Sequence, residues 1–352
     1  MISQEQLIVS LVLGLVLMLA MTAGAGVFTF FERKIAGWTQ GRYGPNRAGP
    51  KGYLQFLADG IKFALKEDVI QDYVVKPVYV IAPGLMMIPA LVLYAAIPIG
   101  KSFVWNGNEV HLQIVQANVG VLYLLAVASI AVYGIVFGAW ASNSRYPFFG
   151  GVRASAQMIS YELAMGLSII SVVLLTSEPG INALSISNIV AGQTGYWFGF
   201  IPRWNLFANP VAFFVFLVCM FAETNRLPFD LAEAEQELVG GYHTEYSAMK
   251  FASFMLSEYV NMITMSMVMV TLFVGGWHFP GIEAIRSQGI QVLLSIGAFG
   301  IKVLFFCFLF LWVRWTLPRF RYDQLMHLGW KALLPVALAS ALGTAIAIAL
   351  RV

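Results

Sequence analysis

The sequence predicts an all-α integral membrane protein with about eight transmembrane helices and one amphipathic helix on the membrane surface. Two properties of the composition support this fold class. Hydrophobic residues make up 59% of the 352 positions, and the mean hydropathy is +0.76. Only 11% of the residues are charged, whereas a soluble domain carries about 25%. We therefore expect a single transmembrane domain over residues 1–352.

Eight apolar runs define the expected helices. A helix needs about 20 apolar residues to cross a bilayer. The runs cover residues 7–31, 78–99, 115–141, 158–176, 209–222, 248–274, 289–313 and 333–350. The first run lacks the basic start of a signal peptide and is too long for its apolar segment, so we interpret it as a retained helix. The fifth run is the shortest, and it spans only if the turn leading to Arg226 is counted with it.

Lysine and arginine residues set the expected orientation. Sixteen of them lie in the connections after the first, third, fifth and seventh runs, and four lie on the opposite side. Because basic residues collect on the cytoplasmic side, both termini should be periplasmic, and an acidic loop over residues 223–247 should be cytoplasmic. The basic residues follow this topology, so the net charge of +3 does not indicate nucleic-acid binding. The sequence style favours a bacterial inner membrane, with the mitochondrial inner membrane as the alternative.

The first cytoplasmic connection has the pattern of an amphipathic helix over residues 52–67. Its apolar and polar side chains recur at helical spacing on opposite faces. The apolar face holds Leu54, Leu57, Ala58, Ile61, Ala64 and Leu65, and the polar face holds Gln55, Asp59, Lys62 and Lys66. Such a helix lies in the membrane surface. A plain topological anchor would have the same periodicity.

Cysteine and histidine usage excludes several chemistries. Cys219 and Cys307 are single residues inside apolar runs, so they provide no spacing for an iron–sulfur cluster or a zinc site. The four histidines are scattered, and no phosphate-binding or dinucleotide glycine motif follows a strand pattern. We therefore expect no metal and no redox cofactor in this chain. If electrons or nucleotides are involved, other subunits carry them.

Three carboxylates occur where a membrane protein rarely has them. Glu162 and Glu258 lie inside apolar runs, and Glu223 lies at the end of the fifth run. An ionisable group in the membrane costs about 2.5 to 3.5 kcal/mol on insertion scales, and such groups mark ion pathways or ligand sites. For Glu223 the alternative is a side chain that reaches water from a helix end.

The segment PFDLAEAEQE at residues 228–237 collects four more acids: Asp230, Glu233, Glu235 and Glu237. If the segment is helical, Glu233 and Glu237 are four residues apart and repel one another. Such repulsion raises at least one apparent pKa, which lets a carboxylate hold and release protons near neutral pH. Helix capping after Pro228 is the alternative, but capping requires one or two acids, not four.

Two long segments resemble a known family. GYLQFLADGIKFALKE at residues 52–67 and ETNRLPFDLAEAEQELVGG at residues 223–241 are similar to the signature segments of the quinone-site membrane subunit, the H type, of respiratory complex I. Supporting matches are FFERKIAGWTQGRYGPNRAGPKG at 30–52, SYE at 160–162, SEY at 257–259 and VRWTLPRFRYDQLMHLGWK at 313–331. The matches occur in family order over nearly the whole chain.

The resemblance implies roles for specific residues. A chamber that ubiquinone or menaquinone enters from the lipid would be lined or braced by Glu32, Arg33, Arg42, Asp59 and Arg314. The acidic proton path would begin with Glu162, Glu223, Glu233, Glu235 and Glu258. Arg226, Asp230 and Glu237 would couple the chamber to that path. From the residues themselves, Arg33 next to Glu32 and Arg226 near Glu223 provide the counter-charges that make protonation states switchable.

The resemblance also implies a function and its partners. The chain would be a subunit of proton-pumping NADH:quinone oxidoreductase, with quinone as substrate and with FMN and iron–sulfur clusters in partner subunits. Its partners would be the quinone-site subunits of the peripheral arm, small membrane-arm subunits and lipids. A related membrane subunit of an energy-converting hydrogenase is one alternative. Another is a stand-alone proton or cation transporter, which the absence of a repeated half disfavours. A purely structural anchor would leave the membrane acids unexplained.

Overall fold

The computed structural model describes residues 4–178, 180–197, 199, 201–232, 239–285 and 287–350. Its α-helices are α1 (Gln4–Thr39), α2 (Gln55–Leu65), α3 (Lys76–Leu93), α4 (Gly120–Ala141), α5 (Arg145–Thr176), α6 (Ile186–Ala191), α7 (Asn205–Ala208), α8 (Pro210–Glu223), α10 (Ala248–Phe273), α11 (Gln288–Thr316), α12 (Tyr322–His327) and α13 (Leu334–Ala349). Short 3-10 turns cover Pro50–Gly52, Tyr94–Ala96, Gly241–His243 and Ile282–Ala284, and a π-helical turn, Leu328–Leu333, joins α12 to α13. Two antiparallel hairpins pair β1 (Phe103–Trp105) with β2 (Asn108–Val110) and β3 (Tyr196–Trp197) with β4 (Ile201–Pro202). The all-α prediction is confirmed.

The long helices match the predicted apolar runs, but they extend further. Among the described residues, seven helical segments are long and apolar enough to cross a membrane, and α8 has only 14 residues, as the short fifth run predicted. α1 continues to Thr39, eight residues past the end of the apolar run, and α5 begins at Arg145, 13 residues before its run. Hydropathy detects only the part of a helix that lies in hydrocarbon, whereas hydrogen bonding continues the helix into polar sequence.

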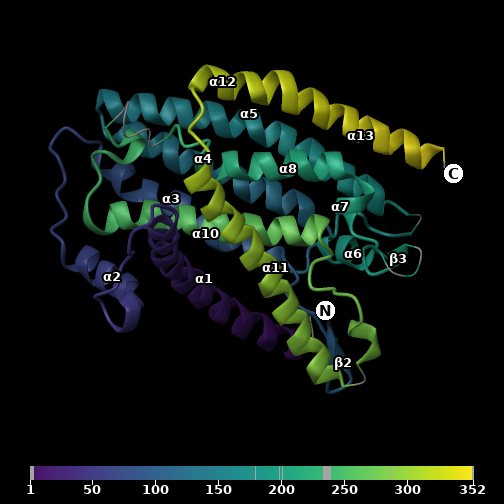
Figure 1. Ribbon diagram of the computed structural model, residues 1–352. Helices are drawn as coiled ribbons and strands as arrows, with labels where there is room; N and C mark the ends of the chain where they lie inside the picture. The colour runs from purple at the N-terminus through teal and green to yellow at the C-terminus, as the bar shows by residue number, and fades with distance from the viewer. Residues whose placement is uncertain are drawn as a thin grey trace.

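Helix α10 is the centre of the bundle. In its most apolar stretch of 18 residues, 89% of the residues are buried, whereas the corresponding share is 6% for α1 and 11% for the helical segment that ends in α13. α3, α1 and α11 pack against α10, while α3, α4 and α5 pack in sequence order beside it, followed by α8 and α13 (Figure 1). Gly134 permits the close contact of α4 with α3, because a Cβ at this position would lie 2.7 Å from the Met86 backbone nitrogen.

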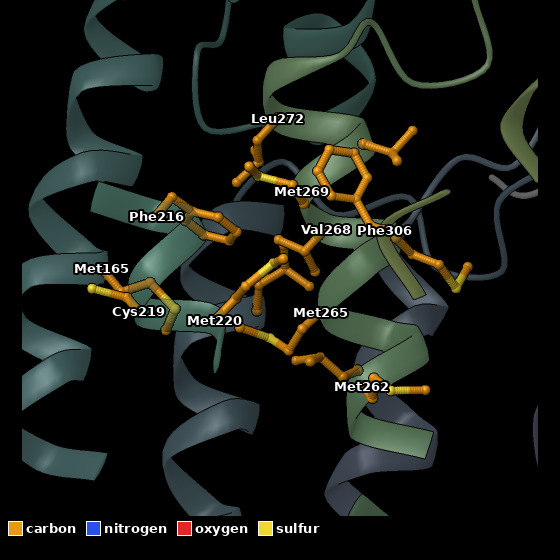
Figure 2. Close-up of a cluster of buried hydrophobic side chains, with 14 of the residues drawn as sticks. Met165, Phe216, Cys219, Met220, Met262, Met265, Val268, Met269, Leu272 and Phe306 are labelled. Atoms are coloured by element: carbon orange, nitrogen blue, oxygen red, sulfur yellow. The ribbon is translucent and has the colours of Figure 1, made fainter. Parts of the chain in front are cut away.

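The core between α8, α10 and α11 is rich in methionine. Met220 of α8 lies among Met262, Met265 and Met269 of α10, with Phe306 of α11 beside them (Figure 2). All five side chains are at most 4% exposed. Unbranched thioethers adapt to irregular spaces between helices, and here they pack together with Val268 and Leu272 of α10. We call the four methionines the methionine seam.

Polar side chains fix the end of the bundle where the loop between α5 and α8 meets α10. Gln193, in this loop after α6, donates from Nε2 to the carbonyl oxygens of Ile189 and Thr271 at 3.2 and 3.0 Å. Its Oε1 accepts from the backbone nitrogens of Asn205 and Gly275 at 3.2 and 3.0 Å. One buried amide therefore holds the loop between α5 and α8 against the end of α10.

Lys302 of α11 caps the same end of α10. Its ammonium donates to the carbonyl oxygens of Val274, Gly276 and His278 at 2.7, 3.0 and 2.6 Å. It also lies 4.8 Å from the centroid of the Trp204 ring. A positive charge at a helix C-terminus is stabilising, because the last carbonyl oxygens carry partial negative charge and have no partner within the helix.

Candidate functional site

A buried carboxylate, Glu32, joins four segments of the chain. Its Oε2 accepts from Arg226 Nη1 at 2.7 Å and from the Tyr259 hydroxyl at 2.8 Å, and its Oε1 accepts from Arg314 Nη1 at 2.6 Å. These residues lie on α1, on the turn after α8, on α10 and in the last turn of α11. Charge-assisted hydrogen bonds of this length are strong in a buried setting. We call these four residues the Glu32 cluster.

The electrostatics of the Glu32 cluster depend on Arg226. Its side chain is 3% exposed, and its guanidinium carbon lies 3.9 Å from the centroid of the Tyr259 ring. Burial alone would lower the pKa of Arg226, but the Glu32 carboxylate beside it raises the pKa above the ordinary value. Arg226 therefore stays charged. With two guanidinium groups around one carboxylate, the cluster has excess positive charge.

A cavity of about 430 Å³ opens beside this cluster. It is lined by Glu32, Arg33, Ala36, Arg42, Tyr43, Gly44, Pro45 and Trp315. The loop after α1 folds back on the helix and forms one wall. The two backbones approach so closely that a Cβ on Gly37 would lie 2.8 Å from the Gly44 backbone nitrogen. This cavity brings together three of the predicted chamber residues: Glu32, Arg33 and Arg42. Apolar walls with a few polar groups suit an organic ligand.

Helix α2 carries Asp59 to the same region. Arg33 Nη1 lies 2.8 Å from Asp59 Oδ2, which links α1 to α2. Phe56 packs on Gly26 of α1, and Phe63 packs on Phe251 of α10. The opposite, apolar face is open: Leu57 is 50% exposed and Leu65 is 82% exposed. The helix is three residues shorter at its start and two residues shorter at its end than predicted, and it has the two-faced character that the sequence indicated.

The membrane carboxylates Glu162, Glu223 and Glu258 have different surroundings. Glu258 is buried and accepts from the Tyr242 hydroxyl at 3.0 Å. Glu162, on α5, accepts from the Ser129 hydroxyl of α4. Glu223, at the last residue of α8, is 2% exposed, and its Oε2 has no hydrogen-bond partner among the described residues.

Glu223 and Glu258 face one small cavity of about 10 Å³, which Thr224, Ser257 and Asn261 also line. The volume is at the lower limit for one water molecule, and Met86, Ala90, Ala131 and Met158 form the apolar part of the lining. Glu223 and Glu258 are the ionisable side chains in this lining.

Asp230 is held in an ion pair. Its Oδ2 lies 2.7 Å from Arg319 Nη2, in the loop between α11 and α12. The Phe320 backbone nitrogen donates to the Pro228 carbonyl oxygen at 3.1 Å, so the segment after α8 is fastened to this loop at two points. The other predicted acids of the loop, Glu233, Glu235 and Glu237, lie outside the described residues.

The charge pairing differs from the one that sequence neighbours suggested. Arg226 pairs with Glu32 and not with Glu223, and Arg33 pairs with Asp59. Consecutive side chains of a helix point about 100° apart, so Glu32 and Arg33 face different elements.

Sequence reasoning missed Tyr259, Tyr242, Ser129 and Arg319, all of which contact predicted site residues. For Tyr259 a signal existed, since it follows Glu258 directly in the SEY segment.

The described residues contain no group of three or more His, Cys, Asp or Glu side chains that could hold a metal ion. The side chains that meet at Glu32 are a carboxylate, two guanidinium groups and a phenol, and a cavity of 430 Å³ beside them is large enough for an organic ligand.

Comparison with known proteins gives consistent matches over almost the full length. The family model described as NADH dehydrogenase matches residues 11–345. An H-type subunit of NADH-quinone oxidoreductase from Cytophaga hutchinsonii is 47% identical over 336 residues, which cover 95% of this chain and 94% of that protein. The H-type subunit of NADH-quinone oxidoreductase from Leptospira biflexa is 50% identical over 322 residues, with 89% and 87% coverage. NADH-quinone oxidoreductase subunit 8 of Rhodothermus marinus is 48% identical over 341 residues, with 94% of each chain covered.

Proposed function

We propose a role for this chain in the quinone chemistry of the enzyme to which it belongs. The chain is a member of the NADH dehydrogenase family, an H-type subunit of NADH-quinone oxidoreductase. In our proposal it forms the quinone chamber of that enzyme and the start of its proton path. The chain is a membrane subunit of an oxidoreductase complex, and the three relatives described above carry the name of NADH-quinone oxidoreductase. The observation that carries the proposal is the Glu32 cluster at the wall of the 430 Å³ cavity.

The chemistry of the cavity suits quinone reduction. A quinone ring gains two electrons and two protons when it becomes a quinol, so negative charge develops on its oxygens before the protons arrive. Arg33 and Arg42 in the cavity wall stabilise that charge, and Arg226 and Arg314 hold the Glu32 carboxylate ready to respond to it. The electrons come from FMN and iron–sulfur clusters in partner subunits. Ubiquinone and menaquinone both fit this chemistry.

The membrane carboxylates start the proton path. Glu223 and Glu258 line the same small cavity, and Glu162 interacts electrostatically with Glu223. Glu233 and Glu235 continue the path on the cytoplasmic side, and Asp230 and Glu237 lie in the same loop. Arg226, three residues after Glu223, connects this loop to the chamber.

The location that we propose in the cell rests on the distribution of basic residues and on the exposed apolar side chains. The basic connections favour a cytoplasmic face that carries the acidic loop and docks the quinone-site subunits of the peripheral arm, with both termini on the periplasmic side of the inner membrane. The exposed leucines of α2 suit a helix that lies in the membrane surface. The apolar outer faces of α1, α11 and α13 contact lipid or small membrane-arm subunits.

The test is Glu32→Gln in the assembled complex. The amide keeps the shape but removes the charge that both guanidinium groups bind. We expect inhibitor-sensitive reduction of quinone by NADH to fall at least tenfold, since a hydrogen bond to a charged group contributes about 1.5 to 3 kcal/mol. Electron transfer from NADH to a hydrophilic acceptor, which bypasses the chamber, should not change.

Glu178→Gln is the matched control. Glu178 lies in the loop after α5, and its carboxylate makes a long contact of 3.9 Å with the Arg203 guanidinium. Its variant should keep wild-type rates. If Glu32→Gln also keeps wild-type quinone reduction in a fully assembled complex, the chamber does not depend on this cluster and the proposal fails.

A further inference from the structure

A groove lies between the end of α4 and the start of α5, away from the residues of the candidate site. Its volume is about 290 Å³. Seven of its eight lining residues are apolar, and the full lining is Val136, Phe137, Ala139, Trp140, Phe148, Gly151, Val152 and Ser155. We call it the α4–α5 groove.

Small residues bring the two helices together at this groove. A Cβ on Gly151 of α5 would lie 2.3 Å from the Ala139 Cβ of α4, so the helices touch there with almost no side chain between them. Trp140 of α4 and Phe148 of α5 line the groove beside this contact. A narrow apolar channel of this kind accommodates a flexible hydrocarbon chain, whereas a helix with its side chains is about 10 Å across and too wide to enter.

The groove continues into a wider, more polar mouth of about 680 Å³. The two spaces share Ala139, Trp140 and Phe148, and the mouth adds Asn143, Ser144, Arg145 and Phe149. Arg145 is the charged side chain of this lining. It is exposed, and it forms no ion pair with any residue that the structure describes. The mouth therefore carries a positive charge that is available to an anion.

The mouth lies at a membrane surface. α4 is long enough to cross a membrane and ends at Ala141, so the connection that follows it leaves the hydrocarbon. Trp140 and Tyr146, both more than half exposed, are of the two residue types that collect at membrane–water interfaces. The mouth is therefore at the level of the lipid headgroups, and the apolar groove extends from it along α4 and α5.

We propose that the α4–α5 groove binds an anionic phospholipid, with one acyl chain over Ala139 and Gly151 and the phosphodiester group at Arg145. A phospholipid supplies both parts that the site requires, a hydrocarbon chain and a negative charge at the membrane surface. A guanidinium forms strong charge-assisted hydrogen bonds with phosphate oxygens. The basic connection between α4 and α5 is expected on the cytoplasmic side, where anionic lipids attract arginine.

The test is photo-crosslinking of the assembled complex in vesicles of phosphatidylcholine. The probe is phosphatidylglycerol with a diazirine on one acyl chain, and the comparison probe is phosphatidylcholine with the same modified chain. After irradiation the intact complex is isolated and digested, and mass spectrometry gives the share of this chain's label that falls on residues 136–155. We expect this share to be about fivefold higher for phosphatidylglycerol, the preference that one arginine near a membrane surface provides.

Two variants separate the charge from the groove. Arg145→Gln removes the charge and leaves the groove, so the share for phosphatidylglycerol should fall about fivefold, to the value for phosphatidylcholine. Val152→Trp fills the groove from a half-exposed position, so the label on Ala139 and Gly151 should decrease for both probes.

Lys331→Gln is the matched control. Lys331 is an exposed basic residue in the π-helical turn before α13, on the same expected face of the membrane as Arg145. Its variant removes the same charge away from the groove and should keep the wild-type share for both probes.

Two results would overturn the inference. Equal shares for the two probes, unchanged in Arg145→Gln, would mean that the groove takes up boundary lipid without selecting a headgroup. A groove without label in the intact complex would mean that a neighbouring subunit covers it. Both results are independent of quinone binding, so they leave the proposed function as it stands.

Discussion

Removal of the Lys302 ammonium should loosen the contact between α10 and α11. The change is Lys302→Met, which keeps the length of the side chain but leaves the carbonyl oxygens of Val274, Gly276 and His278 without their donor. Hydrogen bonds from a charged donor contribute about 1.5 to 3 kcal/mol each. Relief of the desolvation of the ammonium offsets part of this loss. The net cost should be about 3 to 5 kcal/mol, the range for removing one partner of a buried charged contact.

The assay uses a cysteine that is already at this contact. The sulfur of Cys307 on α11 lies 3.5 Å from the Ser266 hydroxyl oxygen on α10, and Cys307 is fully buried. In a Cys219→Ala background, a membrane-permeable maleimide reacts with Cys307 only when the two helices separate. Each 1.4 kcal/mol changes the open population about tenfold, so the labelling rate should rise by roughly 100-fold to several thousand-fold.

A surface lysine provides the control. The Lys101 ammonium donates to Gln291 Oε1 at 3.0 Å on the same side of the molecule, and Lys101 is only partly buried. Lys101→Met should leave the labelling rate within about twofold. A rise of less than about fivefold in Lys302→Met would refute the reasoning, because the three carbonyl oxygens would then find equivalent partners.

Three further predictions concern other parts of the chain. Asp230→Arg should reduce assembly or activity, because it breaks the ion pair with Arg319. The double variant Asp230→Arg with Arg319→Asp, which exchanges the two charges, should recover part of the loss. No recovery would indicate that Asp230 acts as a proton carrier and not as an anchor. Burial and the nearby Lys302 ammonium lower the pKa of His278, so the unfolded chain binds the proton more tightly than the folded protein does. The stability of the folded protein should therefore be full above about pH 6.5 and should fall as the pH drops below this value. The midpoint of thermal denaturation should follow this pH dependence in the wild type and not in His278→Gln. Glu233→Gln with Glu235→Gln should abolish inhibitor-sensitive quinone reduction and proton pumping together in an assembled complex, whereas wild-type rates would mean that these acids cap a helix or form a docking surface.

The transmembrane helices could be predicted because burial in hydrocarbon requires long apolar runs. Among the described residues, seven of the eight runs form helices long enough to cross a membrane, and the fifth forms the shorter helix α8. Their ends could not be predicted from the same property. α1 continues through Glu32 because the carboxylate finds Arg226 and Arg314 inside the protein, so polar sequence there is compatible with a buried helix. The loop between α5 and α8 also contains α6, α7 and a β3–β4 hairpin. Contacts such as those of Gln193 fix these elements, and their sequences carry no strong pattern of their own.

The candidate site was predictable as a set of residues but not as a set of pairs. Glu162, Glu223 and Glu258 stand out because charges are rare in this chain. Their partners lie far away in the sequence: Glu32 and Arg226 are 194 positions apart, and Glu32 and Tyr259 are 227 apart. One sequence contains no information about which distant cation meets which acid. The small cavity between Glu223 and Glu258 is likewise a product of tertiary packing.

The methionine seam makes the contact between α8 and α10 mechanically compliant. Glu223 is the last residue of α8 and Glu258 is on α10, so relative motion of these helices changes the separation of the two carboxylates. Thioether side chains can change rotamer as helices slide, and they refill the space that branched side chains would leave as a void. Oxidation to methionine sulfoxide would introduce polar groups there and stiffen or separate the helices. We therefore expect the contact between the two carboxylate-bearing helices to tolerate more relative motion than the end of α10 that Gln193 and Lys302 hold.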